Sequence, residues 1–97
     1  MNLAATHVSR IAAFEAALYM DTKTHGKYFH ARAINLLSEI YTKESQAALT
    51  RFAQVAEAKM GPTQETRNAA LRQDPSLWTD LESARLALAK LSLILSP

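Results

Sequence analysis

The chain has 97 residues, with 11 Lys and Arg against 9 Asp and Glu, and it contains no cysteine. This length suits one hydrophobic core, so we expect a single domain over residues 1–97. Without cysteine there is no disulfide, thiolate zinc site or Cys nucleophile. The net charge of +2 is spread along the chain, which disfavours a strongly basic nucleic-acid-binding domain. No apolar run is long enough to span a bilayer, so a soluble cytoplasmic protein is expected.

The composition favours an all-α fold. Ala and Leu dominate the periodic segments, only two glycines and three prolines interrupt the chain, and 48% of the residues are hydrophobic. That share excludes wholesale disorder. The apolar periodicity predicts a compact bundle of four to five helices, at about 3–20, 27–41, 44–60, 63–73 and 75–95.

The first two predicted helices can form an antiparallel hairpin about Thr24, because a polar turn separates them. In that register His7 lies near Tyr41 and His30 lies near Leu18, with both histidines on the apolar sides of their helices. The two imidazoles are then at opposite ends of the hairpin and cannot share a metal ion. We expect both to be structural residues, and no metal site.

The second and third helices are predicted to be separate. If one straight helix ran from residue 27 to Met60, Glu44 would lie in the middle of its apolar face. A break at 42–45 removes this conflict, with Thr42 as a new N-cap and Glu44 in the first turn. A curved helix that contacts two different neighbours would give the same pattern.

No catalytic motif is present in the sequence. There is no HExxH, no G-x-S-x-G elbow and no glycine-rich phosphate loop. Paired carboxylates such as Asp80 and Glu82 are expected to be solvated surface charges. We therefore expect a protein that is not an enzyme and has no cofactor.

Two groups of cationic side chains could contact an anion or a nucleic acid. The first surrounds the start of the second helix, where free backbone N–H groups attract anions, and consists of Lys23, His25, Lys27 and Arg32. The second lies on the fourth helix and consists of Arg67 and Arg72. Such groups are also common at solvated corners.

Residues 55–76 resemble the helix-turn-helix of small repressors and antitoxins, in which a glycine turn precedes the recognition helix. The residues that carry this resemblance are Ala56, Gly61, Thr66 and Leu71. It departs from the motif because Pro62 follows the glycine, one residue too many separates Ala56 from Gly61, and Arg67 stands at an apolar packing position. The resemblance implies a small nucleic-acid-binding regulator, whereas the alternative is an ordinary connection within a bundle.

The last helix has the clearest pattern in the sequence. Asp74 and Pro75 suit its N-cap and first position. Its core stripe is expected to consist of Leu77, Leu81, Ala84, Leu88, Leu91 and Leu95. Opposite this stripe or beside it lie further apolar residues, namely Trp78, Leu86, Ala89, Leu93 and Ile94. The second half of the helix is therefore apolar on nearly every side and needs neighbours all round.

Those neighbours can come from this chain or from another. Either the domain encloses the helix centrally, or Leu86, Leu93 and Trp78 are exposed and form a homodimer or partner surface. We expect a non-enzymatic protein that acts through protein–protein association, as a homo-oligomer, an adaptor or an inhibitor of a target protein. Bacteria and phages encode many compact proteins of this kind. The nucleic-acid-binding regulator is the alternative.

Overall fold

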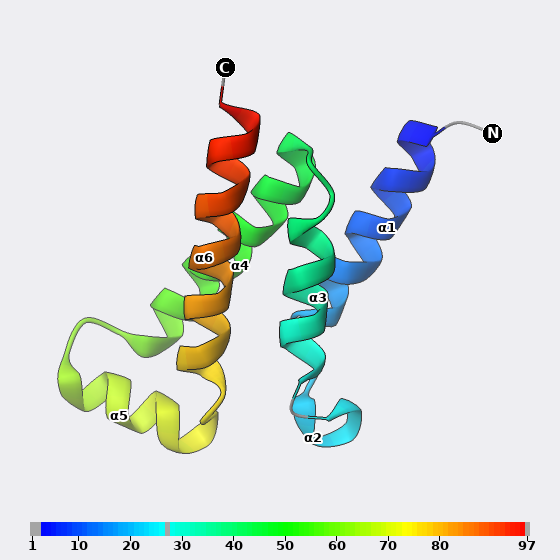
Figure 1. The fold of residues 1–97 in the computed structure, drawn as a ribbon. Helices are drawn as coiled ribbons and strands as arrows, with labels where there is room; N and C mark the ends of the chain where they lie inside the picture. The colour runs from blue at the N-terminus through cyan, green and yellow to red at the C-terminus, as the bar shows by residue number, and fades with distance from the viewer. Residues whose placement is uncertain (1–2, 27, 97) are drawn as a thin grey trace.

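The structure is a computed structural model that describes residues 3–26 and 28–96, with the backbone alone at residues 3–7. Over these ranges it contains no strand and six helices, which are α1 (Leu3–Ala17), α2 (Thr22–His25), α3 (Phe29–Ser38), α4 (Lys43–Met60), α5 (Gln64–Gln73) and α6 (Leu77–Leu95) (Figure 1). The expected all-α fold is confirmed. The one-turn helix α2, which lies inside the predicted polar turn, was not expected.

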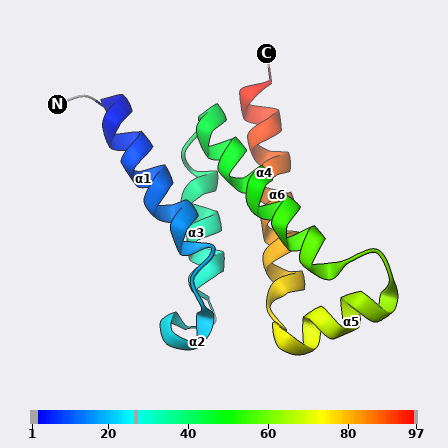
Figure 2. The same ribbon diagram turned by 180° about the vertical axis from the view of Figure 1, so that it is seen from behind.

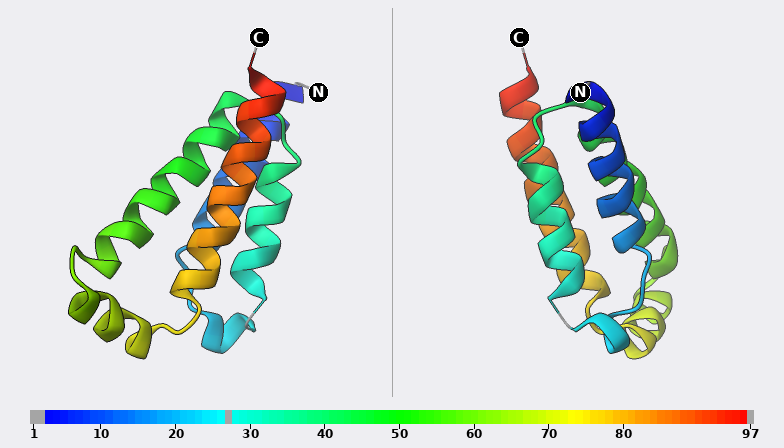
Figure 3. Two further views of the ribbon diagram at one scale, coloured as in Figure 1. Left: turned by 60° about the vertical axis from the view of Figure 1, so that its left-hand side comes forward. Right: turned by 90° about the vertical axis from the view of Figure 1, so that its right-hand side faces the viewer.

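Four of the helices pack in two layers, with α3 and α6 in one and α1 and α4 in the other (Figure 3). Seen from behind, α4 begins beside the end of α3 and crosses diagonally over α6 (Figure 2). Helix α5 lies across the end of the molecule and contacts both α4 and α6. The core lies between the layers, and its most deeply buried large side chains are Leu18, Ile34, Leu37, Leu49, Leu81 and Leu91.

Helices α1 and α3 form the expected hairpin, and α2 closes it (Figure 1). Helix α1 ends at Ala17, three residues earlier than predicted, and α3 is shorter than the predicted helix at both ends. Asp21 caps α2, because its carboxylate accepts a hydrogen bond from the N–H of Thr24 at 2.7 Å. The contact predicted between His7 and Tyr41 cannot be placed, since the side chain of His7 lies outside the described residues.

The predicted break between the second and third helices is confirmed. Helix α3 ends at Ser38, and Thr42 caps α4 by accepting a hydrogen bond from the N–H of Ser45 at 3.2 Å. The buried hydroxyl of Ser45 donates to the carbonyl of Leu37 at 2.5 Å. That carbonyl also accepts a hydrogen bond from the N–H of Ile40 at 3.1 Å, so the side chain of Ser45 adds a bond that joins the two helix ends.

A glycine turn separates α4 from α5. Gly61 has φ +72°, and a Cβ atom added there would lie 2.5 Å from Oγ1 of Thr66. Thr66 is held in that place by a capping box, in which Thr63 and Thr66 bond each other's backbone N–H groups. Helix α5 contains no buried residue, which confirms the short, exposed helix expected here.

The predicted start of the last helix is wrong by two residues. Helix α6 begins at Leu77, and Asp74 instead ends α5, with its N–H donating to the carbonyl of Ala70. The carboxylate of Asp74 accepts a hydrogen bond from the hydroxyl of Ser76 at 2.8 Å. It therefore does not cap α6, which has no side-chain cap.

The two-layer arrangement leaves outer helix faces uncovered. The Cα radius of gyration is 14.1 Å, and the principal extents are 48 × 33 × 16 Å. A compact domain of this length has a radius of gyration of about 12.5 Å. The molecule is thus a thin slab with a core inside and two broad outer faces.

Within the described ranges, none of the helices combines the length and the hydropathy needed to cross a bilayer.

Candidate functional site on the outer face of the last helix

The outer face of α6 carries a stripe of exposed apolar side chains formed by Leu86, Ala89 and Leu93. Their spacing of three and four residues puts them on one side of the helix, opposite the buried Leu81 and Leu91. Leu86 is 73% exposed and Leu93 is 82% exposed. The alternative in which this chain encloses α6 centrally is therefore wrong. We refer to these three residues as the outer stripe.

The other two residues predicted on this surface are exposed but stand apart from the outer stripe. Ile94 is 46% exposed and follows Leu93, so it points about 100° further round the helix. Trp78 is 41% exposed, and the guanidinium of Arg67 from α5 lies 5.5 Å from the centre of its ring. Trp78 thus belongs to the junction between α5 and α6.

Charged groups beside the outer stripe are bound within the same chain. Arg85 donates to Glu57 at 2.7 Å and to Glu82 at 2.9 Å, and these hydrogen bonds raise the pKa of the guanidinium. The ammonium of Lys90 lies 5.7 Å from the ring centre of Tyr41. Tyr41 lies beyond the end of α3 and is 54% exposed.

A hollow of about 270 Å³ opens between α3 and α6, beside Leu86. Its wall consists of Asn35, Ser38, Ser83, Leu86, Ala87 and Lys90. Four of these six side chains are polar or charged and two are apolar, and none of the six is acidic. The hollow extends the exposed surface of α6 toward α3.

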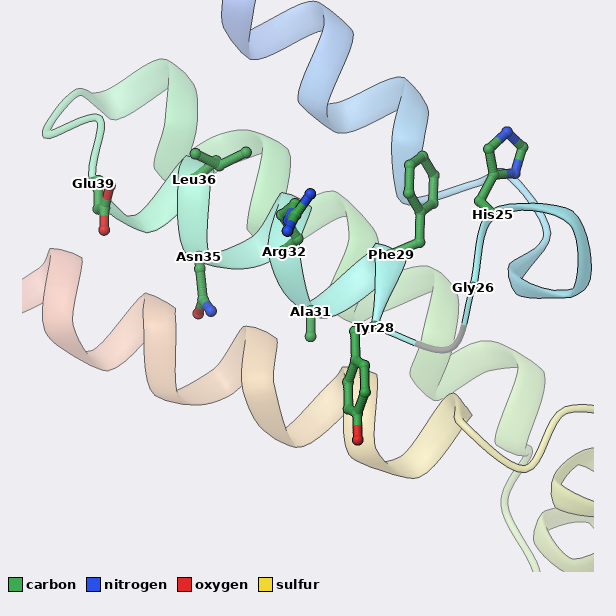
Figure 4. A pocket seen from close by; sticks show the side chains of 9 residues that line it. All are labelled: His25, Gly26, Tyr28, Phe29, Ala31, Arg32, Asn35, Leu36 and Glu39. Atoms are coloured by element: carbon green, nitrogen blue, oxygen red, sulfur yellow. The ribbon is translucent and has the colours of Figure 1, made fainter.

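A larger depression of about 540 Å³ lies over the exposed side of α3 (Figure 4). The ring of His25 stacks on Phe29, with ring centres 4.5 Å apart, and Arg32 lies on the same side. Tyr28 and Asn35 point to the side of α6. The lining residues therefore surround an exposed helix and do not enclose a deep pocket.

The structure keeps apart the two cationic groups predicted as an anion or nucleic-acid contact, although His25 and Arg32 of the first group line the same depression. Lys23 and His25 lie on α2, Arg32 lies on α3, and Lys27 is outside the described residues. Arg67 and Arg72 lie on α5, which does not contact α2 in the described part of the chain. The two predicted groups are thus not brought together.

The corner at α2 also contains a carboxylate. Hydrogen bonds from Thr24 lower the pKa of Asp21, so this group is ionised near neutral pH. The carbonyl of Asp21 accepts a hydrogen bond from Nδ1 of His25 at 3.0 Å. The negative charge weakens the attraction of this corner for anions.

A buried ion pair joins α3 to α6, which the sequence did not predict. Nδ1 of His30 lies 2.7 Å from Oδ2 of Asp80, and the side chains are 10% and 6% exposed. Nε2 of His30 lies 2.5 Å from the carbonyl oxygen of Met20. His30 borders the core as expected, but the assignment of Asp80 to the solvated surface is wrong.

The hydrogen-bond partners fix the protons of this pair. A carbonyl oxygen can only accept, so Nε2 of His30 carries a hydrogen toward Met20. One further proton is shared between Nδ1 and the carboxyl of Asp80, and burial raises the pKa of that carboxyl against the opposing effect of His30. Both ring nitrogens are occupied, which makes the imidazole a structural link and leaves it no position for a metal ion or a substrate.

One signal in the sequence could have indicated this pair. Asp80 lies within the arc of the helix that contains Leu77, Ala84 and Leu91. A carboxylate on an apolar face needs a partner, and His30 was predicted on the apolar side of its own helix. Pairing the two would have required knowing that α3 and α6 are neighbours.

No metal site is evident in the described residues, where no three His, Asp or Glu side chains are grouped to hold an ion. Comparison with protein-family models, curated proteins and solved structures gives no match. A proposal for the function of the protein therefore depends on its exposed surfaces.

Proposed function

We propose that the protein has no catalytic activity and acts by binding another protein through the outer stripe of α6. The observation that carries this proposal is the exposure of Leu86 and Leu93 on one face, at 73% and 82%. Contiguous exposed apolar side chains on a small folded protein are typical of a protein–protein interface. A homo-oligomer, an adaptor and an inhibitor would all use such a surface.

The energetic case comes from the two leucines. Covering an exposed leucine side chain contributes about 1.5–3 kcal/mol. The neighbouring Arg85 is already paired with Glu57 and Glu82, so covering the stripe need not leave this charge buried and unpaired. An exposed location also means that substitution at Leu86 or Leu93 should leave the fold intact.

The proposal is tested with the double variant Leu86→Glu/Leu93→Glu. Val8→Glu is the matched control, because Val8 is 58% exposed and lies on α1, in the other layer. We expect the double variant to keep its helical circular dichroism and to lose association with itself or with a target in crosslinking experiments. The control should associate like the unmodified chain. Unchanged association of the double variant would rule the outer stripe out as the binding surface.

The alternative function is a small nucleic-acid-binding regulator that uses α5. Its support is the exposure of this helix, together with the lack of a carboxylate partner for Arg67 and Arg72 among the described residues. In that case, duplex DNA should bind in fluorescence anisotropy, and the affinity should fall steeply as salt rises. The variant Arg67→Ala/Arg72→Ala should bind more weakly. Absence of binding at about 50 mM salt would exclude this alternative.

A further inference from the structure

The chain exposes more surface than a folded monomer of its mass normally does. Its accessible surface is 6460 Å². The scaling of area with mass gives about 5,500 Å² for 10.7 kDa, so roughly 950 Å² is in excess. In a stable interface of standard size each partner buries about 800 Å². The excess, which is spread over the flat molecule, is similar in size to one side of such an interface.

The outer stripe is also suited to packing against itself. A twofold contact uses the same patch on both molecules. The midpoint of the stripe falls between Ala89 and Lys90, and Leu86 and Leu93 lie at equal distances on either side of it. Antiparallel packing about this midpoint puts Leu86 of each molecule against Leu93 of the other, with Ala89 at the crossing, where a small side chain allows close approach.

The hollow beside Leu86 gives this arrangement a further complementary feature. Leu93 is the most exposed of the large apolar side chains in the described residues. In the antiparallel arrangement it reaches the hollow of about 270 Å³ between α3 and α6 of the second molecule. Each molecule thus offers one projecting side chain and one hollow, and the twofold axis matches them in pairs.

From these observations we infer that the partner of the outer stripe is a second copy of this chain, packed antiparallel along α6 about a twofold axis between Ala89 and Lys90. The inference rests on the proposed function and names the partner. It makes α6 the centre of a symmetric assembly, in which α3 of each molecule flanks the contact.

The twofold axis has an electrostatic consequence at Lys90. The two copies of this residue lie close to the axis, where their like charges repel. The ring of Tyr41, 5.7 Å from the ammonium, holds each charge to one side. Salt screens the repulsion, so the dimer should tighten as ionic strength rises. A complex with an acidic partner or with nucleic acid would weaken instead.

Sedimentation equilibrium of the full chain tests the assembly. We expect a monomer–dimer equilibrium that Leu86→Glu or Leu93→Glu shifts to monomer and that Val8→Glu leaves unchanged. Lys90→Gln should tighten the dimer about twofold, because it removes a weak like-charge contact. The same measurement at low and high salt gives the direction of the salt dependence.

Cysteine crosslinking tests the orientation, since the chain has no cysteine of its own. Equal amounts of Leu86→Cys and Leu93→Cys are mixed and oxidised. Disulfides require Cα atoms within about 7 Å, so antiparallel packing should favour the mixed 86–93 crosslink. Parallel packing would favour 86–86 and 93–93 crosslinks and would overturn the inference.

The remaining outcomes separate the inference from the proposed function. A chain that stays monomeric at hundreds of micromolar, or a dimer that is indifferent to Leu86→Glu, overturns the second copy as the partner. If the monomer still crosslinks to a target and the double variant does not, the proposed function stands alone. If the double variant matches the unmodified chain in both assays, the proposed function fails as well.

Discussion

The proton shared by His30 and Asp80 governs what each single residue contributes to stability. The imidazole is oriented by the carbonyl of Met20 at one nitrogen and by the carboxyl of Asp80 at the other. Removing the imidazole leaves a buried carboxyl without its partner. Changing Asp80 to Asn leaves an amide that can still donate to Nδ1 of a neutral ring.

Substitutions of the two partners should therefore differ in cost. We expect His30→Ala to lower the free energy of unfolding by about 3–5 kcal/mol, because it breaks a buried pair from one side. Asp80→Asn should cost about 1–2 kcal/mol, since one hydrogen bond is weakened but kept. Urea unfolding at neutral pH measures both values. Equal losses would contradict the proton assignment.

The pH dependence of stability follows from the raised pKa of Asp80. Burial makes the folded chain hold the proton of this carboxyl more tightly than the unfolded chain does. Its stabilising contribution is thus complete below the unfolded pKa of about 3.9 and is lost as the pH rises through the folded value. The difference in free energy of unfolding between the unmodified chain and Asp80→Asn should fall across that window. A difference that grows with pH would contradict the direction of the shift.

The two glycines allow a comparison of how much stability is lost when a side chain is added at a position with positive φ. Both have positive φ, at +97° for Gly26 and +72° for Gly61. An added Cβ meets nothing within 4 Å at Gly26 but lies 2.5 Å from Oγ1 of Thr66 at Gly61. Gly26→Ala should cost about 1–3 kcal/mol from the backbone alone, since its φ of 97° and ψ of 154° lie in a region that only glycine adopts readily, and Gly61→Ala should cost more. Urea midpoints of the two variants decide the order.

At the level of helices, the junction between α3 and α4 depends on Thr42 and Ser45. We expect Thr42→Ala to destabilise the chain by about 1 kcal/mol, because the first turn of α4 loses its cap. Thr42→Ser keeps the hydroxyl and should lose much less. Thermal unfolding followed by circular dichroism gives the comparison. If both variants lose the same amount, the cap at Thr42 does not stabilise α4.

The helices themselves could be predicted from the sequence, because apolar spacing repeats over many residues. Their ends could not be predicted equally well. Asp74 looks like an N-cap, but its carboxylate is taken by the hydroxyl of Ser76 and its N–H closes α5. The cap at Thr42 was predictable because a straight helix from residue 27 to Met60 would have put Glu44 in the middle of its apolar face.

The exposed surface was predicted as one of two outcomes, and the buried pair was missed for a different reason. Whether Leu86 and Leu93 are covered depends on how many helices pack around α6. The spacing of apolar residues within one helix does not give that number. The burial of Asp80 depends on a residue 50 positions away in the chain. Only the packing of α3 on α6 brings the two groups together.

At the level of the whole molecule, two helix layers enclose one core and leave the outer face of α6 exposed, where we propose that a second copy binds. Mass action then links association to stability, since binding to the folded state alone raises the unfolding temperature. We expect the melting temperature of the unmodified chain to rise with protein concentration. Leu86→Glu/Leu93→Glu should melt at one temperature at all concentrations. Scanning calorimetry over a wide concentration range makes the comparison.

The position of the single tryptophan has a practical consequence for such measurements. Trp78 is the only tryptophan in the chain, and it sits at the junction of α5 and α6 beneath the guanidinium of Arg67. It precedes Leu86 by eight residues, or about 12 Å along the helix. Its fluorescence emission will therefore report the undocking of α5 and the unfolding of α6, with little direct effect from contacts at the outer stripe. Folding of this protein can thus be followed by tryptophan fluorescence and its assembly by sedimentation, without adding a label.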